Sequence, residues 1–573
     1  MEVSLFLILI LQSILIFCEA EVGKSHQICK KLQYDPVKQP YRTAFHFQPP
    51  KNWMNDPNGP MYYKGIYHLF YQYNPYSAIW GNISWGHSIS YNLVDWIDIE
   101  LAISPIESYD INGCWSGSAT ILAEGNPAIL YTGSDFKNRQ VQNLAMPKNV
   151  LDPYLREWIK SDHNPLMAPI GVDPQFFRDP TTAWQGPDKK WRVVVGSQIN
   201  GHGTALLYQS DDFVKWTRSD RPLHFSNKTG MWECPDFYPV SVDGVNGLDT
   251  SVQGKNVKHV LKASFNDHDY YIIGIYEPET DRFSVSPDFM DSNVQLRYDY
   301  GIFYASKTFY DSAKSRRILW AWVTEADGKS DDVDKGWSGL QSIPRSILLD
   351  KTGKQLSQWP IEEIEKLRAK EVNLENKVVE GGTTFEIAGI TSSQADVEVS
   401  FVLPNLHDAE LLPPGLLDPQ LLCSKRNAST EGVIGPFGLL VLASKDLIEH
   451  TAVFFRVFKG HGNFVVLMCS DQSRSSLREE VDKSSFGAFV DVDPTDKISL
   501  RSLIDHSIIE SFGGEGKTCI TARVYPKLAI DKESRLYVFN NGTESITIAN
   551  LSAWSMKGAQ IFPLHKRRKP QLD

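Results

Sequence analysis

The stretch SISYNLVDW at residues 88–96 gives the clearest indication of the fold, because a similar stretch, LYQSDDFVKW, occurs at residues 207–216. In each, a strand-like run reaches a serine, a polar turn follows, and a tryptophan comes a few residues later. The stretch YASKTFY at residues 304–310 is a looser third copy. Strand-and-turn units repeated over this length predict the blades of a β-propeller, and chance similarity between β-hairpins is the alternative.

The remainder of the chain is typical of an all-β protein with two domains. Residues 40–350 contain short aromatic and β-branched runs separated by turn residues. The segment 359–368 breaks this pattern, and its apolar residues Ile361, Ile364 and Leu367 predict a short surface helix. Alternation resumes afterwards, which favours a β-sandwich. We therefore predict a propeller over residues 40–358 and a β-sandwich over residues 370–573.

The composition argues against several classes of partner. The 573 residues include 58 Lys and Arg against 69 Asp and Glu, which gives a net charge of −11. An acidic chain of this kind is not expected to bind nucleic acid. Aromatic residues make up 12% of the chain, which suits β-structure and stacking against sugars. We expect a monomer that needs no cofactor.

The N-terminal segment predicts secretion. Residues 5–17 are apolar apart from Gln12 and Ser13, which is too short a run to span a bilayer, and a small residue, Ala20, offers a cleavage site. We interpret residues 1–20 as a signal peptide and expect no membrane anchor in the mature chain. Five Asn-x-Ser/Thr sequons are consistent with a secreted glycoprotein. They lie at Asn82, Asn227, Asn427, Asn541 and Asn550.

Six of the seven cysteines lie outside this segment. No Cys-x-x-Cys or Cys/His cluster suggests a metal site. A secreted chain permits one or two disulfides. We predict one between Cys469 and Cys519, because both lie in the same C-terminal β-rich region.

Three short motifs each place an acid beside residues that fix the backbone. They are WMNDPNGP at residues 53–60, FRDP at residues 177–180 and WECPDF at residues 232–237. Proline locks φ and biases the preceding residue toward extended conformations. Each motif alone has a structural explanation. The first could be a turn, Arg178 and Asp179 in the second could form a structural ion pair, and Glu233 in the third could be a charge at the rim of the propeller. Together, with acids pointing inward around a propeller axis, they predict an acid–base site.

The sequence resembles glycoside hydrolase family 32, the β-fructofuranosidases of plants, and is most similar to cell-wall invertases and fructan exohydrolases. The resemblance runs from about residue 39 to residue 563. Its most specific marks are the three motifs above and GCWSGS at residues 113–118. It implies a five-bladed propeller followed by a β-sandwich, in agreement with the periodicity.

The resemblance also implies roles for individual residues. Asp56 matches the nucleophile, Glu233 the general acid/base and Asp179 the stabiliser of the transition state. A retaining glycosidase needs a carboxylate to form a covalent ester and a second carboxyl to protonate the leaving oxygen. We expect Asp179 to be an anion, favoured by Arg178. The family positions that line the sugar pocket match Trp53, Asn55, Gln72, Trp80, Trp115, Ser116 and Arg178, and we expect Trp337 to join them.

One departure from the family bears on the substrate. Plant invertases carry an Asp followed three residues later by a Lys in the segment that matches residues 264–271, and the Asp helps to hold the glucose of sucrose. Here Asn266 occupies the Asp position and the Lys is deleted, although Asp267 could substitute through a shift of one residue. An amide cannot accept the charge-assisted hydrogen bonds of a carboxylate. This pattern resembles fructan exohydrolases.

The leading hypothesis is a secreted fructan exohydrolase of the apoplast or cell wall. The alternatives are a cell-wall invertase acting on sucrose, a fructosyltransferase, and a non-catalytic sugar-binding protein. The three intact acids argue against the last of these.

Overall fold

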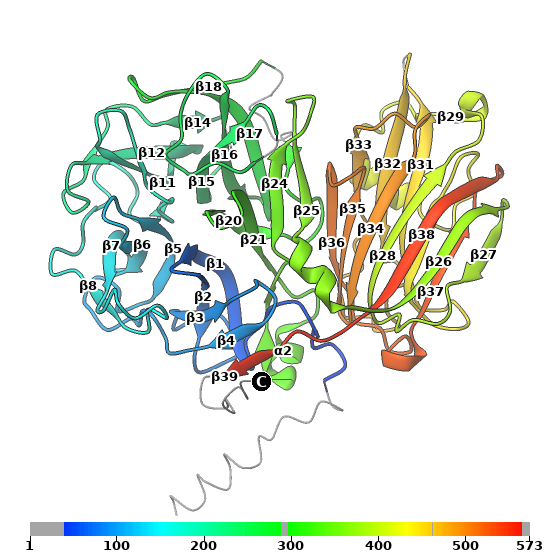
Figure 1. The fold of residues 1–573 in the computed structure, drawn as a ribbon, viewed down its shortest axis with the longest axis horizontal. Helices are drawn as coiled ribbons and strands as arrows, with labels where there is room; N and C mark the ends of the chain where they lie inside the picture. Colours follow the sequence, from blue (N-terminus) through cyan, green and yellow to red (C-terminus); the bar gives the residue numbers. More distant parts are fainter. Residues whose placement is uncertain (1–38, 228, 245, 288–295, 461, 564–573) are drawn as a thin grey trace, which may run out of the picture. The chain divides into compact units, whose positions relative to one another are not determined.

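The computed structural model describes residues 39–563, apart from residues 228, 245, 288–295 and 461. The predicted signal peptide, residues 1–20, lies outside the described residues. Seven β-sheets are present in the described ranges, all within one compact unit, Thr43–Asp573. Five of these sheets are the blades of a propeller and two form a sandwich (Figure 1), which confirms the predicted fold class. No helix in the described ranges is long and apolar enough to span a bilayer.

The first two blades are built from antiparallel strands, with two short parallel strands at the edges of the first. The first contains β1 (Asn52–Tyr63), β2 (Ile66–Asn74), β3 (Ser84–Ser90), β4 (Trp96–Asp98), β22 (Trp337–Ser338) and β39 (Ile561–Pro563). The second contains β5 (Cys114–Ile121), β6 (Pro127–Ser134), β7 (Gln140–Pro147) and β8 (Trp158–Lys160).

The other three blades follow in chain order. The third contains β9 (Phe177–Arg178), β10 (Trp184–Gln185), β11 (Trp191–Ile199), β12 (His202–Ser210), β13 (Thr217–Arg218) and β14 (His224–Ser226). The fourth contains β15 (Glu233–Ser241), β16 (Val257–Phe265), β17 (His268–Glu277), β18 (Arg282–Val285) and β19 (Leu296–Arg297). The fifth contains β20 (Tyr304–Asp311), β21 (Arg316–Val323), β23 (Leu340–Gln341), β24 (Arg345–Leu349) and β25 (Leu356–Pro360), and helix α2 (Lys329–Lys335) follows β21.

The sandwich consists of the two remaining sheets. One contains β26 (Arg368–Val379), β28 (Gln394–Val402), β34 (Ile498–Asp505), β35 (Ile508–Gly513), β36 (Thr518–Arg523) and β38 (Ile546–Met556). The other contains β27 (Thr383–Glu386), β29 (Glu410–Leu411), β30 (Phe437–Ala443), β31 (Thr451–Lys459), β32 (Phe464–Asp471), β33 (Phe486–Val490) and β37 (Arg535–Asn540). The short helices are α3 (Pro419–Lys425), η3 (Leu406–Asp408) and η4 (Asp531–Glu533).

Two of the three sequence repeats have the same local structure. They form the turns between β3 and β4 and between β12 and β13. In each turn the side chain of Asn92 or Asp212 accepts the backbone N–H groups two and three residues ahead. The next residue, Leu93 or Phe213, has a φ of 62° or 63°. The prediction of a third copy is wrong. Residues 304–310 form the first strand of their blade, whereas the other two repeats begin in the third strand of theirs.

The predicted helix at the domain junction is a 3-10 helix, η2 (Glu362–Leu367). Ile361, Ile364 and Leu367 are buried, and a spacing of three residues matches the three residues per turn of a 3-10 helix. The helix connects β25 of the last blade to β26 of the sandwich.

Buried charges join the propeller to the sandwich. Arg345 on β24 donates to Asp299 and to Glu510 on β35. Glu510 also contacts His46 Nε2 at 3.0 Å, and His46 Nδ1 lies 2.8 Å from Asp505. Burial opposes the charged imidazole, but hydrogen bonds to the two carboxylates outweigh burial and raise the pKa of His46. The network ties the segment before β1 to the sandwich.

The predicted disulfide between Cys469 and Cys519 is wrong. Cys469 on β32 is bonded to Cys423 of helix α3, with a Cα–Cα distance of 5.7 Å, and Cys519 is a buried free thiol. Cys519 lies on β36 in the other sheet, and its side chain packs in the apolar cluster between sandwich and propeller. Cys469 packs in a different cluster, with α3. The two side chains therefore face different cores.

Candidate active site

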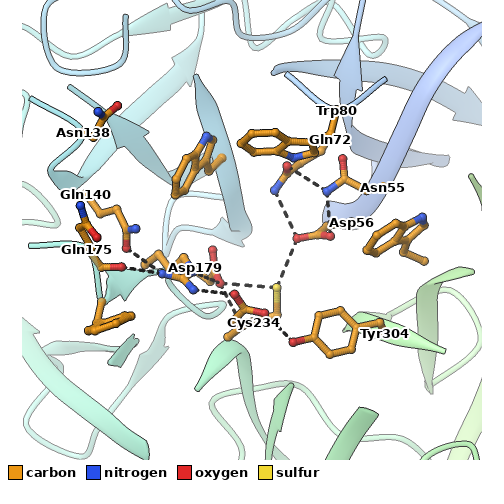
Figure 2. Close-up of a pocket in the computed structure, with 15 residues that line it drawn as sticks. Asn55, Asp56, Gln72, Trp80, Asn138, Gln140, Gln175, Asp179, Cys234 and Tyr304 are labelled. Carbon is orange, nitrogen blue, oxygen red and sulfur yellow. Dashed lines mark hydrogen bonds and ion pairs between the residues drawn. The ribbon is translucent and has the colours of Figure 1, made fainter. Parts of the chain in front are cut away.

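A cavity of about 560 Å³ opens where the first strands of the five blades meet (Figure 2). Each of these strands contributes to its lining. Asp56 comes from β1, Trp115 from β5, Arg178 from β9, Glu233 from β15 and Tyr304 from β20. The fold therefore brings side chains nearly 250 residues apart into one pocket.

The pocket residues lie at irregular positions in their strands. The pairing register shifts between Met54 and Pro57 on β1, and again between Glu233 and Asp236 on β15. Similar shifts occur at the start of β5 and of β20. Asp179 directly follows β9 and has a φ of 65°. Bulges of this kind re-aim side chains and are common beside active sites. The prolines after Asp56, Asp179 and Cys234 are the sequence signal for these irregular positions.

Asp56 is held by a ring of donors. Asn55 Nδ2 donates to Oδ1 over 3.0 Å, and Gln72 Nε2 donates to Oδ2 over 3.2 Å. The Ser116 hydroxyl also donates to Oδ2. Burial raises the pKa of Asp56 to about 6, helped by the negative charges of Asp179 and Glu233 and opposed by the hydrogen bonds from Ser116 and Asn55. The predicted nucleophile thus accepts hydrogen bonds from three of the expected pocket residues, Asn55, Gln72 and Ser116.

Asp179 accepts the backbone N–H of Cys234 over 2.8 Å, and its own N–H donates to Thr132. Arg178 Nε lies 3.8 Å from Asp179 Oδ2. Burial raises the pKa of Asp179, although Arg178 and the Cys234 N–H favour the anion. Arg178 therefore favours the Asp179 anion, as expected, but the effect of burial on the pKa is larger.

Glu233 has two partners. Arg178 Nη2 lies 2.5 Å from Oε1, and the Tyr304 hydroxyl donates to Oε2 over 2.5 Å. Cys234, the next residue, places its thiol 3.4 Å from Asp56 and 3.6 Å from Asp179. Burial keeps the pKa of this thiol well above its ordinary value, so it is a neutral group between two acids. Sequence reasoning missed the contact between Tyr304 and Glu233.

The expected aromatic residues occupy different places. Trp80 is 53% exposed and its ring centroid lies 6.1 Å from that of Trp115, so the two form part of the pocket wall. Trp53 does not line the cavity but donates from Nε1 to Asn55 Oδ1 over 2.7 Å. Trp337 is 2% exposed, lies against Lys335, and is not part of the lining. That expectation is wrong because β22 pairs with the start of β1 and is covered.

Asn266 also lies outside the pocket lining, contrary to expectation. Asn266 and Asp267 form the tip of the hairpin between β16 and β17, where Phe265 pairs directly with His268. Both tip residues have positive φ and both are exposed. The remaining lining residues that sequence reasoning missed come mostly from loops and carry no motif. They are Asn138, Gln140, Gln175, Phe176 and Trp322.

The five sequons differ in accessibility. Asn82, Asn227 and Asn550 are exposed. Asn427 and Asn541 are partly buried, and the Asn541 amide nitrogen donates to the carbonyl of Ala428 over 3.2 Å. A glycan is attached through this nitrogen, so the exposed three are the better acceptors.

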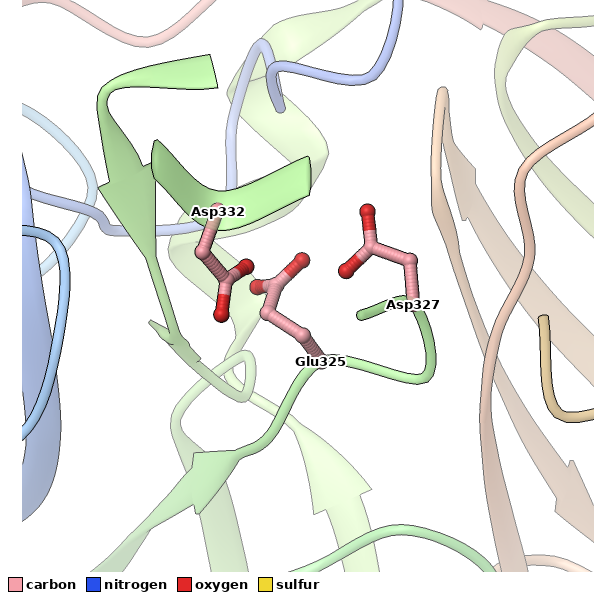
Figure 3. A group of neighbouring side chains, drawn as sticks. All are labelled: Glu325, Asp327 and Asp332. Atoms are coloured by element: carbon pink, nitrogen blue, oxygen red, sulfur yellow. The ribbon is translucent and has the colours of Figure 1, made fainter. Parts of the chain in front are cut away.

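A second group of carboxylates lies outside the pocket, at Glu325, Asp327 and Asp332 (Figure 3). Lys335 Nζ lies among them, 2.5 Å from Asp327 and 3.1 Å from each of the other two. The Lys335 ammonium therefore provides the positive charge that the three carboxylates share. Glu325 accepts the Gly339 N–H over 2.9 Å and binds Arg523 of the sandwich, so the group fixes the turn beside β1.

Paired carboxylates beside amide and aromatic side chains are the groups that a glycosidase, an enzyme that cleaves glycosidic bonds, requires. The chain belongs to glycosyl hydrolases family 32. Residues 46–360 match the N-terminal domain of this family and residues 363–555 match its C-terminal domain.

The chain is similar to proteins named β-fructofuranosidase and to proteins named fructan exohydrolase. The chain is 58% identical over 555 residues to β-fructofuranosidase, insoluble isoenzyme CWINV1, of Arabidopsis thaliana, covering 94% of this chain and 95% of the relative. It is also 58% identical over 531 residues to fructan 6-exohydrolase of Beta vulgaris, covering 91% and 88%. The crystal structure of fructan 1-exohydrolase IIa from Cichorium intybus is similar, with a TM-score of 0.90, 58% identity and coverage of 92% and 99%.

Proposed function

We propose that this protein is a fructan exohydrolase that releases terminal β-D-fructofuranosyl units with retention of configuration. The observation that carries the choice of substrate is the set of carboxylates in the pocket. Of the described residues that line it, only Asp56, Asp179 and Glu233 are acids, and the other polar groups are mainly amides. Asn266 and Asp267, at the tip of the hairpin between β16 and β17, are not among the residues that line the pocket.

The reaction follows from the chemistry of the three acids. The Asp56 carboxylate attacks the anomeric carbon while Glu233 gives its proton to the departing oxygen, so that a fructosyl ester forms and the shortened chain leaves. Glu233, now an anion, takes a proton from water, and the hydroxide displaces Asp56 from the anomeric carbon. Asp179 stabilises the positive charge that develops on the ring. Tyr304 and Arg178 orient Glu233 for both steps.

A second candidate is a cell-wall invertase that hydrolyses sucrose. It is favoured by the relatives named β-fructofuranosidase, which include CWINV1 at 58% identity. The two candidates share the pocket acids and differ only in what binds beyond the terminal fructose. A non-catalytic sugar-binding role is disfavoured, since all three acids are present and hydrogen-bonded.

We further propose the setting in which this enzyme acts. A signal peptide over residues 1–20 and a secreted glycoprotein of the apoplast or cell wall are consistent with relatives named insoluble or cell-wall isoenzymes. We assign the catalytic propeller to residues 40–358 and the sandwich to residues 370–573.

Product analysis tests the proposed substrate. Purified protein is incubated separately with sucrose, inulin and levan, and the released sugars are separated by chromatography. We expect free fructose as the main product from at least one fructan, with little hydrolysis of sucrose. Efficient sucrose hydrolysis with intact inulin and levan would establish the invertase instead. The Asp56→Ala protein, purified in the same way, controls for contaminating glycosidases.

A further inference from the structure

A second cavity of about 450 Å³ lies beside the pocket. Its walls are the loop at residues 171–176, which precedes β9, and the hairpin turn at residues 198–201, which joins β11 to β12. Phe176 lines both cavities, and Gln175 lines the first. The two cavities are therefore separated by one aromatic side chain and its neighbour.

This dividing wall is fixed to the catalytic residues. Arg178, whose guanidinium binds Glu233, also donates from Nη1 to the carbonyl of Gln175 over 2.9 Å. The Ser197 hydroxyl donates to the carbonyl of Phe176 over 2.7 Å. The Phe176 N–H donates to the carbonyl of Asp173 over 3.0 Å. A ligand that lay across Phe176 would thus be held at a constant position relative to the acid.

The lining has the chemistry of a site for a neutral carbohydrate. Phe176, Val172 and Ile199 are half-buried and present apolar surface, which suits the C–H faces of sugar rings. Gln198 and Asn200 supply amide donors and acceptors for hydroxyl groups. Asp173 is the one charged residue among the described lining residues, and it is acidic, so the lining itself does not favour an anion.

We propose that this second cavity binds the sugar units of a fructan chain that lie beyond the two flanking the cleaved bond. The inference rests on the proposed fructan exohydrolase activity and adds a preference for chain length. The terminal fructosyl unit occupies the pocket at Asp56 and Glu233, the chain crosses Phe176, and later units lie between the loop at residues 171–176 and the turn at residues 198–201. Sucrose and a trisaccharide are too short to use the cavity fully.

The test measures kcat/KM for sucrose and for fructans of three, four and five units. For the natural protein we expect kcat/KM to rise about tenfold from three units to five, which corresponds to about 1.4 kcal/mol of added binding. Val172→Trp fills the cavity and should abolish this rise while leaving the value for sucrose within about twofold. Val242→Trp, at an exposed site outside both cavities, is the matched control.

A second, less disruptive variant tests the inference if Val172→Trp does not fold. Gln198→Ala with Asn200→Gly removes the amides, and glycine tolerates the φ of 52° at position 200. This double variant should also lose most of the rise. Fructan hydrolysis that is equally fast at every chain length, or a rise that survives both changes, overturns the inference and leaves the exohydrolase standing. Failure to cleave any fructan overturns the proposed function itself.

Discussion

Arg178 joins the predicted general acid to the stabilising carboxylate: its Nη2 lies 2.5 Å from Glu233 Oε1 and its Nε lies 3.8 Å from Asp179 Oδ2. The same guanidinium binds the carbonyl of Gln175 at the edge of the second cavity. One side chain therefore contacts two of the three pocket acids and also the backbone of the wall between the two cavities. Arginine suits this role because its planar group presents several donors in fixed directions.

The first prediction concerns the two acids that make and break bonds. Asp56→Ala and Glu233→Ala should each fold and lose activity. General acid–base assistance alone is worth about 10²–10⁴-fold, and loss of the nucleophile should cost at least as much. The measurement is kcat on a fructan substrate, with circular dichroism to establish folding. Glu277→Ala, at an exposed site on β17, is the control and should keep full activity. Near-normal turnover by either pocket variant would contradict the role proposed for that acid.

The second prediction concerns pH. Burial raises the pKa of Asp56 to about 6, and attack requires the anion, so kcat/KM should fall as the pH drops below about 6. Ser116→Ala removes a donor that favours the anion, and the acid limb should move to higher pH. A hydrogen bond to a charged group contributes about 1.5–3 kcal/mol, or roughly one to two pKa units.

The control for this shift is Ser118→Ala. Ser118 lies on the same strand as Ser116 but donates to the carbonyl of Pro180 and not to Asp56. The acid limb of the pH profile of Ser118→Ala should therefore be the same as that of the unmodified protein. An unchanged profile in Ser116→Ala would mean that Asp56 does not govern the acid limb.

A third prediction concerns His46 at the junction between propeller and sandwich. Its pKa is raised in the folded state, so its contribution to stability is fully present below the unfolded pKa of about 6.5 and is lost as the pH rises through the folded pKa. His46→Gln should therefore lower the free energy of unfolding more at pH 5 than at pH 9. Chemical denaturation at both values measures the difference.

His259→Gln provides the opposite case. Burial lowers the pKa of His259 to about 3, so this neutral histidine reduces stability at pH 5 but not at pH 9. His259→Gln should therefore lower the free energy of unfolding less at pH 5 than at pH 9. Equal effects of His46→Gln at the two pH values would show that the network does not raise the pKa of His46.

The fourth prediction concerns the disulfide. Peptide mapping without reduction should find Cys423 linked to Cys469 and should find Cys114, Cys234 and Cys519 as free thiols. Cys423→Ser should lower the free energy of unfolding by about 2–4 kcal/mol, whereas Cys519→Ser should leave the linked peptide in place. A peptide that joins Cys469 to Cys519 would restore the pairing expected from sequence.

The fold class and the meeting of three acids in one pocket could be predicted from sequence, because both depend on local patterns. The turns at Asn92 and Asp212 repeat within the chain, and prolines follow Asp56, at a register shift of β1, and Asp179, which has a positive φ just after β9. Tertiary neighbours were not predictable in this way. The partner of Cys469 depends on where helix α3 packs, and the contact between Tyr304 and Glu233 depends on how the fourth and fifth blades meet.

The fifth prediction concerns Asn266. Because its side chain is exposed at a hairpin tip outside the pocket lining, Asn266→Asp should change kcat/KM for sucrose by less than about twofold. Activity on fructan should be unaffected, since the contacts of Asp56, Asp179 and Glu233 are untouched. Asp267→Asn is the matched control at the same tip. A large gain on sucrose from Asn266→Asp would place this residue at the sugar after all.

The most direct test of the proposed activity is the ratio of kcat/KM for a fructan trisaccharide to kcat/KM for sucrose, measured on the unmodified protein at its optimum pH. Of the described residues that line the pocket, only Asp56, Asp179 and Glu233 are acids, and the proposed reaction uses all three at the terminal fructose. We therefore expect the trisaccharide to be favoured by about tenfold or more. A ratio below one would contradict the account and would identify an invertase.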